Sequence, residues 1–217
     1  MRVLSRRLPA LAAATVLTAA CAACGGSQPT TPAASPGAGS SFPATVSAAN
    51  GAVHIGSRPT AIISLSPTST EMLYAIGAGS QVKAVDNDSD YPPQAPQTKL
   101  SGFQPNVEAI VGYKPDLVVV DGNTGLIKRL AQFKIPVLEM PAAAKLSDVY
   151  AQFGELGRAT GHVVQAQREN ARLRSQLAQI AAAEPHHASP LTYYYELDQT
   201  YYSVTSDTFV GQLLRLL

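Results

Sequence analysis

Four short, predominantly apolar runs constrain the fold of this chain most strongly. They cover residues 61–65, 82–85, 117–120 and 137–140, each is of strand length, and polar or helical sequence separates them. Strands that are apolar on both sides belong to sheets covered on both faces, as parallel sheets are. Their alternation with helices predicts an α/β fold built on a parallel sheet.

Cap residues predict where the helices begin. Ser66 with Pro67 behind it suits the start of a helix that ends at Gly77, and Asn106 suits the start of a short helix through residue 111. Further amphipathic helices are expected at 125–133, 147–160 and 162–182.

Two hairpins are expected outside the sheet. Residues 45–48 and 52–55 flank Asn50-Gly51, the dipeptide that best supplies the two positive φ angles of a type I′ turn. Residues 191–197 and 201–204 form the second candidate pair, followed by a last helix capped by Ser206 or Asp207. No stop signal follows that helix before Leu217, so we expect a second lobe that is started and incomplete.

The N-terminal residues have the pattern of an export signal. Arg2, Arg6 and Arg7 precede an Ala-rich apolar stretch over residues 8–23. The stretch is short for a membrane span, which takes roughly 20 residues, and small residues dominate it. We therefore expect residues 1–24 to be a signal peptide, and residues 25–43, rich in Gly, Ser, Pro and Thr, to be a disordered tether.

Both cysteines of the chain, Cys21 and Cys24, lie at the end of this stretch. Neither a distributed disulfide framework nor a redox motif at a strand-to-helix turn fits that position. The residues around Cys24 resemble a bacterial lipoprotein signal, in which an acylated cysteine becomes the mature N-terminus, and Cys21 is the second choice. We expect an exported protein anchored in the outer face of the cell membrane through Cys24.

Composition excludes several classes of protein. The formal net charge is +1 and the basic residues are scattered among acids, so no nucleic-acid partner is expected. No nucleophile elbow, phosphate loop, dinucleotide fingerprint or zinc-protease motif occurs, which indicates a protein that is not an enzyme and has no cofactor. A metal receptor is the alternative, but the candidate ligands are only His54, His162, His186 and His187, none at a predicted strand end.

Several motifs, in order and spacing, resemble the periplasmic binding proteins for vitamin B12, haem and iron-siderophores. They are residues 62–71, Ser89-Asp90-Tyr91-Pro92-Pro93, Pro115-Asp116-Leu117-Val118, and Tyr201-Tyr202 to Asp207-Thr208. The resemblance implies a bilobal fold whose parallel-sheet lobes are joined by one long helix, here residues 162–182. It also implies a corrinoid, haem or ferric siderophore bound between the lobes and delivered to an ABC transporter permease.

On this reading residues 44–144 form the first lobe, 145–183 the connecting helices and 184–217 the start of the second lobe. Ligands of open parallel sheets bind outside the carboxyl ends of the strands. We therefore expect a site made by Ser66, Tyr91, Phe103, Asp121, Asn123 and Thr124, together with Tyr201 from the resembling motif of the second lobe.

Two interpretations are open for each of Tyr91, Phe103 and Glu71. Tyr91 and Phe103 either stack on a flat ligand or pack under their own loops. Asp121 resembles a position that carries a large aromatic residue in the cobalamin binder, so a carboxylate there argues against cobalamin itself and permits a cationic, metal-chelated or hydroxylated ligand. Glu71 either complements a helix dipole or, as the resemblance implies, pairs with arginines of the permease.

Overall fold

The computed structural model describes residues 41–183, 192–196 and 198–216. The expected signal peptide, both cysteines and most of the expected tether lie outside these residues, as do His186, His187 and Leu217. None of the helices in the described ranges combines the length and apolarity needed to cross a bilayer.

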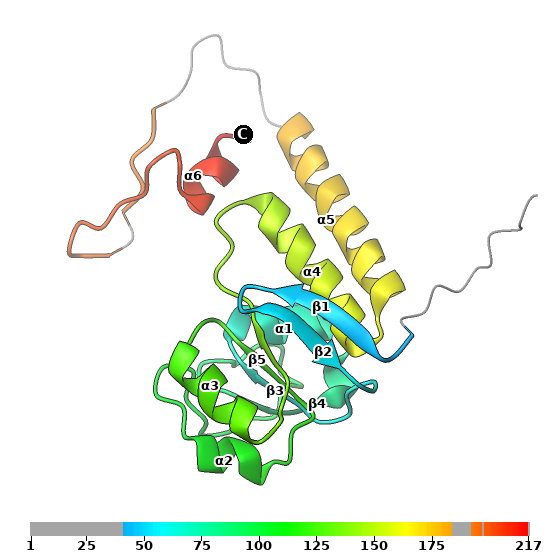
Figure 1. The fold of residues 1–217 in the computed structure, drawn as a ribbon. Helices are drawn as coiled ribbons and strands as arrows, with labels where there is room; N and C mark the ends of the chain where they lie inside the picture. Colours follow the sequence, from blue (N-terminus) through cyan, green and yellow to red (C-terminus); the bar gives the residue numbers. More distant parts are fainter. Residues whose placement is uncertain (1–40, 184–191, 197, 217) are drawn as a thin grey trace, which may run out of the picture. The chain divides into compact units, whose positions relative to one another are not determined.

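A four-stranded parallel sheet forms the centre of the first lobe (Figure 1). Its strands are β3 (Ile62–Leu65), β4 (Val82–Val85), β5 (Leu117–Val120) and β6 (Val137–Glu139), in the order β4-β3-β5-β6. The four apolar runs thus all become strands, and the predicted α/β class is confirmed.

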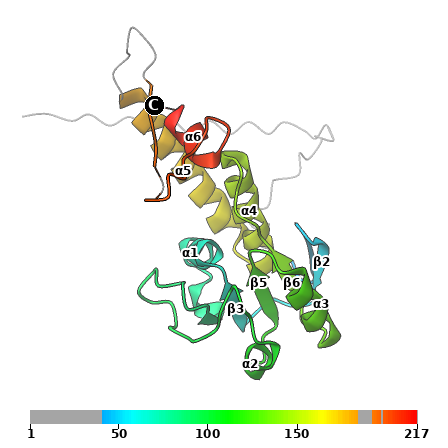
Figure 2. The same ribbon diagram turned by 90° about the vertical axis from the view of Figure 1, so that its left-hand side faces the viewer.

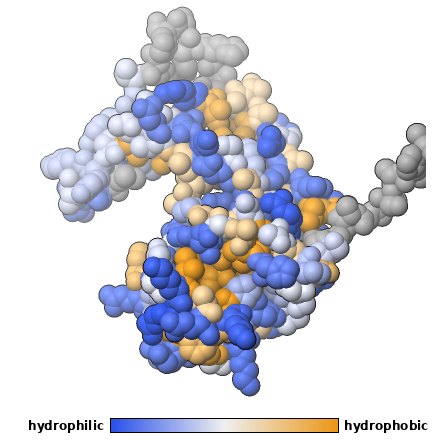
Figure 3. Space-filling model, viewed as in Figure 1, coloured by the Kyte–Doolittle hydropathy of each residue, from blue (hydrophilic) through white to orange (hydrophobic). Residues whose placement is uncertain are grey.

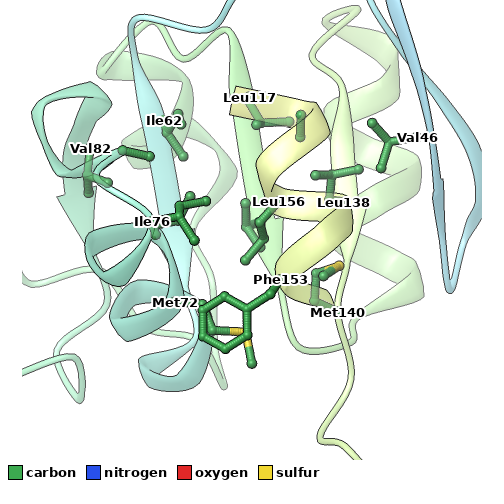
Figure 4. Close-up of a cluster of buried hydrophobic side chains, with 14 of the residues drawn as sticks. Val46, Ile62, Met72, Ile76, Val82, Leu117, Leu138, Met140, Phe153 and Leu156 are labelled. Carbon is green, nitrogen blue, oxygen red and sulfur yellow. The ribbon is translucent and has the colours of Figure 1, made fainter. Parts of the chain in front are cut away.

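Helices cover both faces of this sheet. The helices α1 (Pro67–Ala75) and α4 (Leu146–Thr160) pack on one face, and α2 (Val107–Gly112) and α3 (Thr124–Gln132) pack on the other. Alternate residues of β5 serve the two cores, since Leu117 and Val119 belong to one cluster and Val118 and Val120 to the other. Figure 4 shows Leu117 and Ile62 pointing toward Leu156 of α4 in the first cluster. This double burial explains why the strands carry so few polar residues.

Asp116 fastens the amino ends of β3 and β5 together. Its carboxylate accepts hydrogen bonds from Thr60 N at 2.7 Å, Thr60 Oγ1 at 2.9 Å and Ala61 N at 2.9 Å. The Pro115-Asp116 motif therefore has a structural role at the amino ends of the strands, opposite their carboxyl ends.

The first hairpin is present, but its turn differs from the prediction. Strands β1 (Ala44–Ala48) and β2 (Gly51–Ile55) pair antiparallel, and Gly51 has φ 103° whereas Asn50 has no positive φ. The expected type I′ turn is therefore wrong. The Asn50 amide instead bonds the outer edge of β6, donating to Val137 O at 2.9 Å and accepting from Glu139 N at 3.1 Å.

Two helices follow the lobe, and Figure 2 shows them side by side. Helix α4 ends at Gly161, which adopts φ 80°, and α5 spans Val163–Ala183. At ~1.5 Å per residue α5 is about 31 Å long. Ala166 is its one buried residue, and Ile180 near its C-terminus is 51% exposed. Figure 3 shows that apolar surface, drawn in orange, is exposed in several places on this side of the molecule.

The described residues beyond 191 form less regular structure than the sequence predicts. The expected second hairpin is reduced to a single antiparallel bridge between Glu196 and Ser203. The last helix, α6 (Phe209–Leu214), is capped by Thr208, whose Oγ1 accepts from Gly211 N at 3.1 Å. The cap is thus neither Ser206 nor Asp207. Thr208 is the cap because it lies three residues before Gly211, whose backbone N–H donates to its hydroxyl.

Candidate ligand-binding site

The strand order creates a topological switch point between β3 and β5. The chain leaves β3 through α1 and crosses to β4 on one side, whereas β5 leads through α3 to β6 on the other side. The loops after β3 and β5 therefore diverge, and a crevice opens between their carboxyl ends.

A pocket of about 490 Å³ lies at this crevice. Loops after three parallel strands line it, and so does the segment after Leu100, which forms a parallel bridge with Asp86. The lining residues are Leu65, Ser66, Pro67, Asp86, Asp88, Gly102, Phe103, Asp121 and Gly122. The pocket thus brings together Ser66, Phe103 and Asp121, three of the predicted site residues.

Ser66 lies at the base of this pocket and begins α1. Its side chain accepts from Ser69 N at 3.4 Å, and Pro67 occupies the first turn, as the sequence predicts. Because Ser66 is only 4% exposed, it shapes the floor of the pocket more than it offers a free hydroxyl.

Phe103 has the opposite character. Its side chain is 86% exposed while its neighbour Gly102 packs against the ends of β3 and β4, so the ring stands at the pocket without packing under its own loop. An exposed aromatic face beside a pocket suits stacking on a flat ligand.

A buried chain of hydroxyl groups fixes the carboxyl group of Asp86. Ser89 Oγ bonds Asp86 Oδ1 and lies 2.9 Å from Thr70 Oγ1, which donates to Ser64 Oγ at 2.8 Å. Ser64 Oγ in turn donates to Ser66 O at 3.2 Å. The network connects the pocket wall to the first turn of α1.

Burial raises the pKa of Asp86; the Ser89 hydrogen bond lowers it, and the nearby charge of Asp88 raises it further. Ser89 Oγ donates to Asp86 Oδ1, so the carboxyl group is the acceptor at the end of this network.

Other predicted site residues lie elsewhere. Asn123 caps α3, its Oδ1 accepting from Leu126 N at 3.0 Å, and Thr124 is the exposed first residue of that helix. Tyr201 is 77% exposed, has φ 64° and does not line the pocket. These three residues do not join the group around Ser66, Phe103 and Asp121.

Tyr91 lines a different, larger groove of about 760 Å³. Glu71 of α1, Phe153 of α4 and Arg172 of α5 line the same groove. Glu71 is exposed there. Tyr91 and Glu71 thus share a groove that is separate from the pocket at the strand ends.

The histidines within the described ranges do not approach this pocket. His54 is exposed on β2, and His162 is buried at the junction of α4 and α5, where its Nε2 lies 3.1 Å from Arg58 Nη2 and its Nδ1 lies 3.0 Å from Thr160 Oγ1. Arg58 can only donate, so Nε2 accepts and Nδ1 carries the proton. No group of three or more His, Cys, Asp or Glu suited to a metal ion occurs among the residues that the structure describes.

Asp86, Asp88 and Gly102 are pocket residues that the sequence does not single out. From the segment that contains Asp86 and Asp88, the expected site includes Tyr91 alone. A glycine directly before an aromatic residue, as in Gly102-Phe103, is the signal that could have marked the close approach of this loop.

Comparison with known proteins agrees with this geometry. A family model described as "Periplasmic binding protein" matches residues 62–217. A cobalamin-binding protein of Halobacterium salinarum is 35% identical over 181 residues, which are 79% of this chain and 48% of that protein. An uncharacterized ABC transporter substrate-binding lipoprotein of Bacillus subtilis is 30% identical over 187 residues, covering 81% and 60% of the two chains.

The fold is also found in solved structures. A possible iron-binding (periplasmic solute-binding) protein of Staphylococcus epidermidis superposes with a TM-score of 0.66 at 24% identity, covering 74% of this chain and 66% of that one. The chain belongs to the periplasmic binding protein family. It spans 48% to 60% of the length of the two curated relatives.

Proposed function

We propose that this protein captures a small solute outside the cytoplasm and delivers it to the permease of an ABC importer, binding its ligand without chemical turnover. The pocket at the carboxyl ends of β3 and β5 is the observation that carries this proposal. It lies where open parallel sheets bind ligands, and it combines an exposed aromatic ring with polar side chains.

The ligand belongs to the class of corrinoids, haem and ferric siderophores. Relatives described as cobalamin-binding and iron-binding support that class. Ser66, Phe103 and Asp121 form one wall of the site, and residues after 184, including Tyr201, begin the lobe that carries the opposite wall. Tyr91, Asn123 and Thr124 do not line this pocket: Tyr91 lines the groove beside α1, and Asn123 caps α3.

Binding of cobalamin, haemin and a ferric siderophore to the chain, followed by absorbance titration, tests this proposal. We expect one of the three to bind, and Phe103→Ala to weaken its binding about tenfold, the equivalent of ~1.4 kcal/mol lost from stacking. Phe133→Ala is the matched control, since Phe133 is also exposed, at 53%, but does not line the pocket. Equal loss in both variants, or binding of none of the three ligands, would contradict the proposal.

Export and lipid anchoring are the second part of the proposal. The signal pattern ending at Cys24 supports them, and so does the lipoprotein of Bacillus subtilis among the relatives. Cys24→Ala should abolish incorporation of labelled fatty acid in cells, whereas Cys21→Ala should retain it. The reverse result would make Cys21 the anchor.

A further inference from the structure

The turn that joins α4 to α5 is fastened to the first lobe by side chains from outside the two helices. Thr160 O, at the C-terminal end of α4, accepts from Arg58 Nε at 3.0 Å and from Gln81 Nε2 at 3.2 Å. Gln81 Nε2 also donates to Pro59 O at 2.6 Å. This clamp ties the end of α4 to the segment before β3 and to the 3₁₀ turn Gly79–Gln81, so it fixes the point from which α5 departs.

Two glycines allow the close contacts of this clamp. Gly161 adopts φ 80°, and a Cβ there would lie 2.9 Å from Arg58 Nε. A Cβ at Gly157 would lie 2.6 Å from the Cβ of Ala166. The Arg58 side chain and the first turn of α5 therefore approach α4 more closely than a larger residue at either glycine would permit.

His162 belongs to the same clamp and is only 8% exposed. Its Nε2 lies 3.1 Å from Arg58 Nη2, and its Nδ1 lies 3.0 Å from Thr160 Oγ1. Arg58 can only donate, so Nε2 is the acceptor, and only a neutral imidazole has an acceptor nitrogen. Protonation of His162 therefore removes this hydrogen bond and sets two positive groups against each other.

The charges around the clamp do not offset that repulsion. Arg58 is the charged group that acts on His162, and no ion pair joins His162 to an acid within the described ranges. The acid at the amino ends of the strands, Asp116, is engaged by the backbone before β3. Arg158 and Arg168, the next charged residues along the chain on either side, are exposed and basic. The clamp thus suits a neutral His162.

We propose that acid opens this clamp: protonation of His162 displaces Arg58, loosens the base of α5 from the first lobe and lets the far end of the helix move. Because the released state binds the proton more tightly, each unit of pH across the transition shifts the equilibrium about tenfold toward release. A helix ~31 Å long turns a small rotation at its base into a larger displacement at its far end. The inference goes beyond the proposed function, and its test needs no ligand.

The distance between two spin labels measures the orientation of α5. The labels are attached at Lys83→Cys on β4 and Ala178→Cys on α5, both exposed positions, in the full chain with Cys21→Ser and Cys24→Ser. In a series from pH 8 to pH 4.5 we expect a narrow distance distribution that broadens with acid. The change should be centred below 6.5, the ordinary pKa of histidine. Circular dichroism at each pH shows that the chain stays folded.

Two variants separate the clamp from other effects of acid. His162→Gln offers an amide oxygen to Arg58 and cannot be protonated at these pH values, so its distribution should stay narrow throughout the series. Arg58→Ala lacks both the donor and the like charge, so its distribution should be broad at every pH. His54→Gln, at an exposed position on β2, is the control and should behave as the parent chain.

The imidazole proton resonances of His162, followed over the same series, show when it titrates. A distribution that stays unchanged while His162 titrates overturns the inference. Broadening with acid that persists in His162→Gln, or that Arg58→Ala still shows, overturns it as well. If His162→Gln does not fold, the resonance titration and Arg58→Ala decide the question. None of these results bears on ligand capture by the pocket at the strand ends.

Discussion

The first lobe and the structure that follows it are stabilised in different ways. In the lobe, residues such as Ile62, Ile63 and Leu117 are fully buried, and the sheet is covered on both faces. In α5 only Ala166 is buried, and in the described residues from 192 onward only Gly211 is.

The aromatic residues show the same contrast. Phe153 is 6% exposed against the sheet, whereas Tyr194 and Tyr202 are each 68% exposed. Apolar burial is the main favourable term in folding, at ~25 cal/mol per Å². The lobe therefore holds its own core, whereas α5 is attached to it chiefly through its first turns and α4.

Matched isoleucine substitutions give the sharpest test of this contrast. Ile62→Ala removes a fully buried side chain from the central sheet and should lower the free energy of unfolding by about 2–5 kcal/mol. Ile180→Ala removes a side chain that is 51% exposed on α5 and should change it by less than about 0.5 kcal/mol. Urea unfolding followed by circular dichroism measures both. Similar losses would mean that the C-terminal half of α5 is packed in solution.

The junction between the two regions should respond to pH through His162. Burial, and then the charge of Arg58, lower the pKa of His162 from its ordinary value of 6.5. The unfolded chain therefore takes up a proton near pH 6.5, while the folded chain does so only at lower pH. Between these values the unfolded state binds more protons, so stability falls as pH falls below about 6.5.

Urea unfolding at several pH values between 5 and 8 measures this dependence. His162→Gln should flatten it, and His54→Gln, at an exposed position on β2, should not. A slope that is unchanged in His162→Gln would show that another group controls the acid side of the stability profile.

The smallest effect on folding is expected at the lobe surface. Glu71 is exposed on α1 and makes no ion pair with the described residues, so Glu71→Ala should change the free energy of unfolding by less than about 0.5 kcal/mol. In a receptor with its permease the same variant should weaken docking and leave ligand affinity unchanged. Loss of ligand affinity would instead place Glu71 in the binding site.

Much of the lobe could be predicted from the sequence because its signals are local. Apolar runs of strand length mark β3 and β5, and Ser66-Pro67 fixes the start of α1 through one short-range hydrogen bond. The same signals place Asp121 after β5, at the carboxyl end where the pocket lies.

The rest depends on contacts between residues far apart in the chain. Leu100 pairs with Asp86, and this pairing decides that Gly102 and Phe103 reach the pocket while Tyr91 turns toward α1 and α5. No periodic pattern in the sequence between Asp86 and Phe103 predicts the path that the backbone takes there. Asn123 illustrates a second limit, because a residue suited to bind a ligand is equally suited to cap a helix.

The hairpin tip at Asn50 has a consequence for self-association. An outer parallel strand leaves a row of backbone groups on which another chain can add, the first step toward ordered aggregates. Here Ala49 N bonds Glu139 O at 3.0 Å, and the amide of Asn50 occupies Val137 O and Glu139 N, so the tip of the turn terminates the sheet as a further strand would. Removing that single amide would leave these backbone groups of β6 free to pair with a strand of another chain, while the rest of the lobe stays folded.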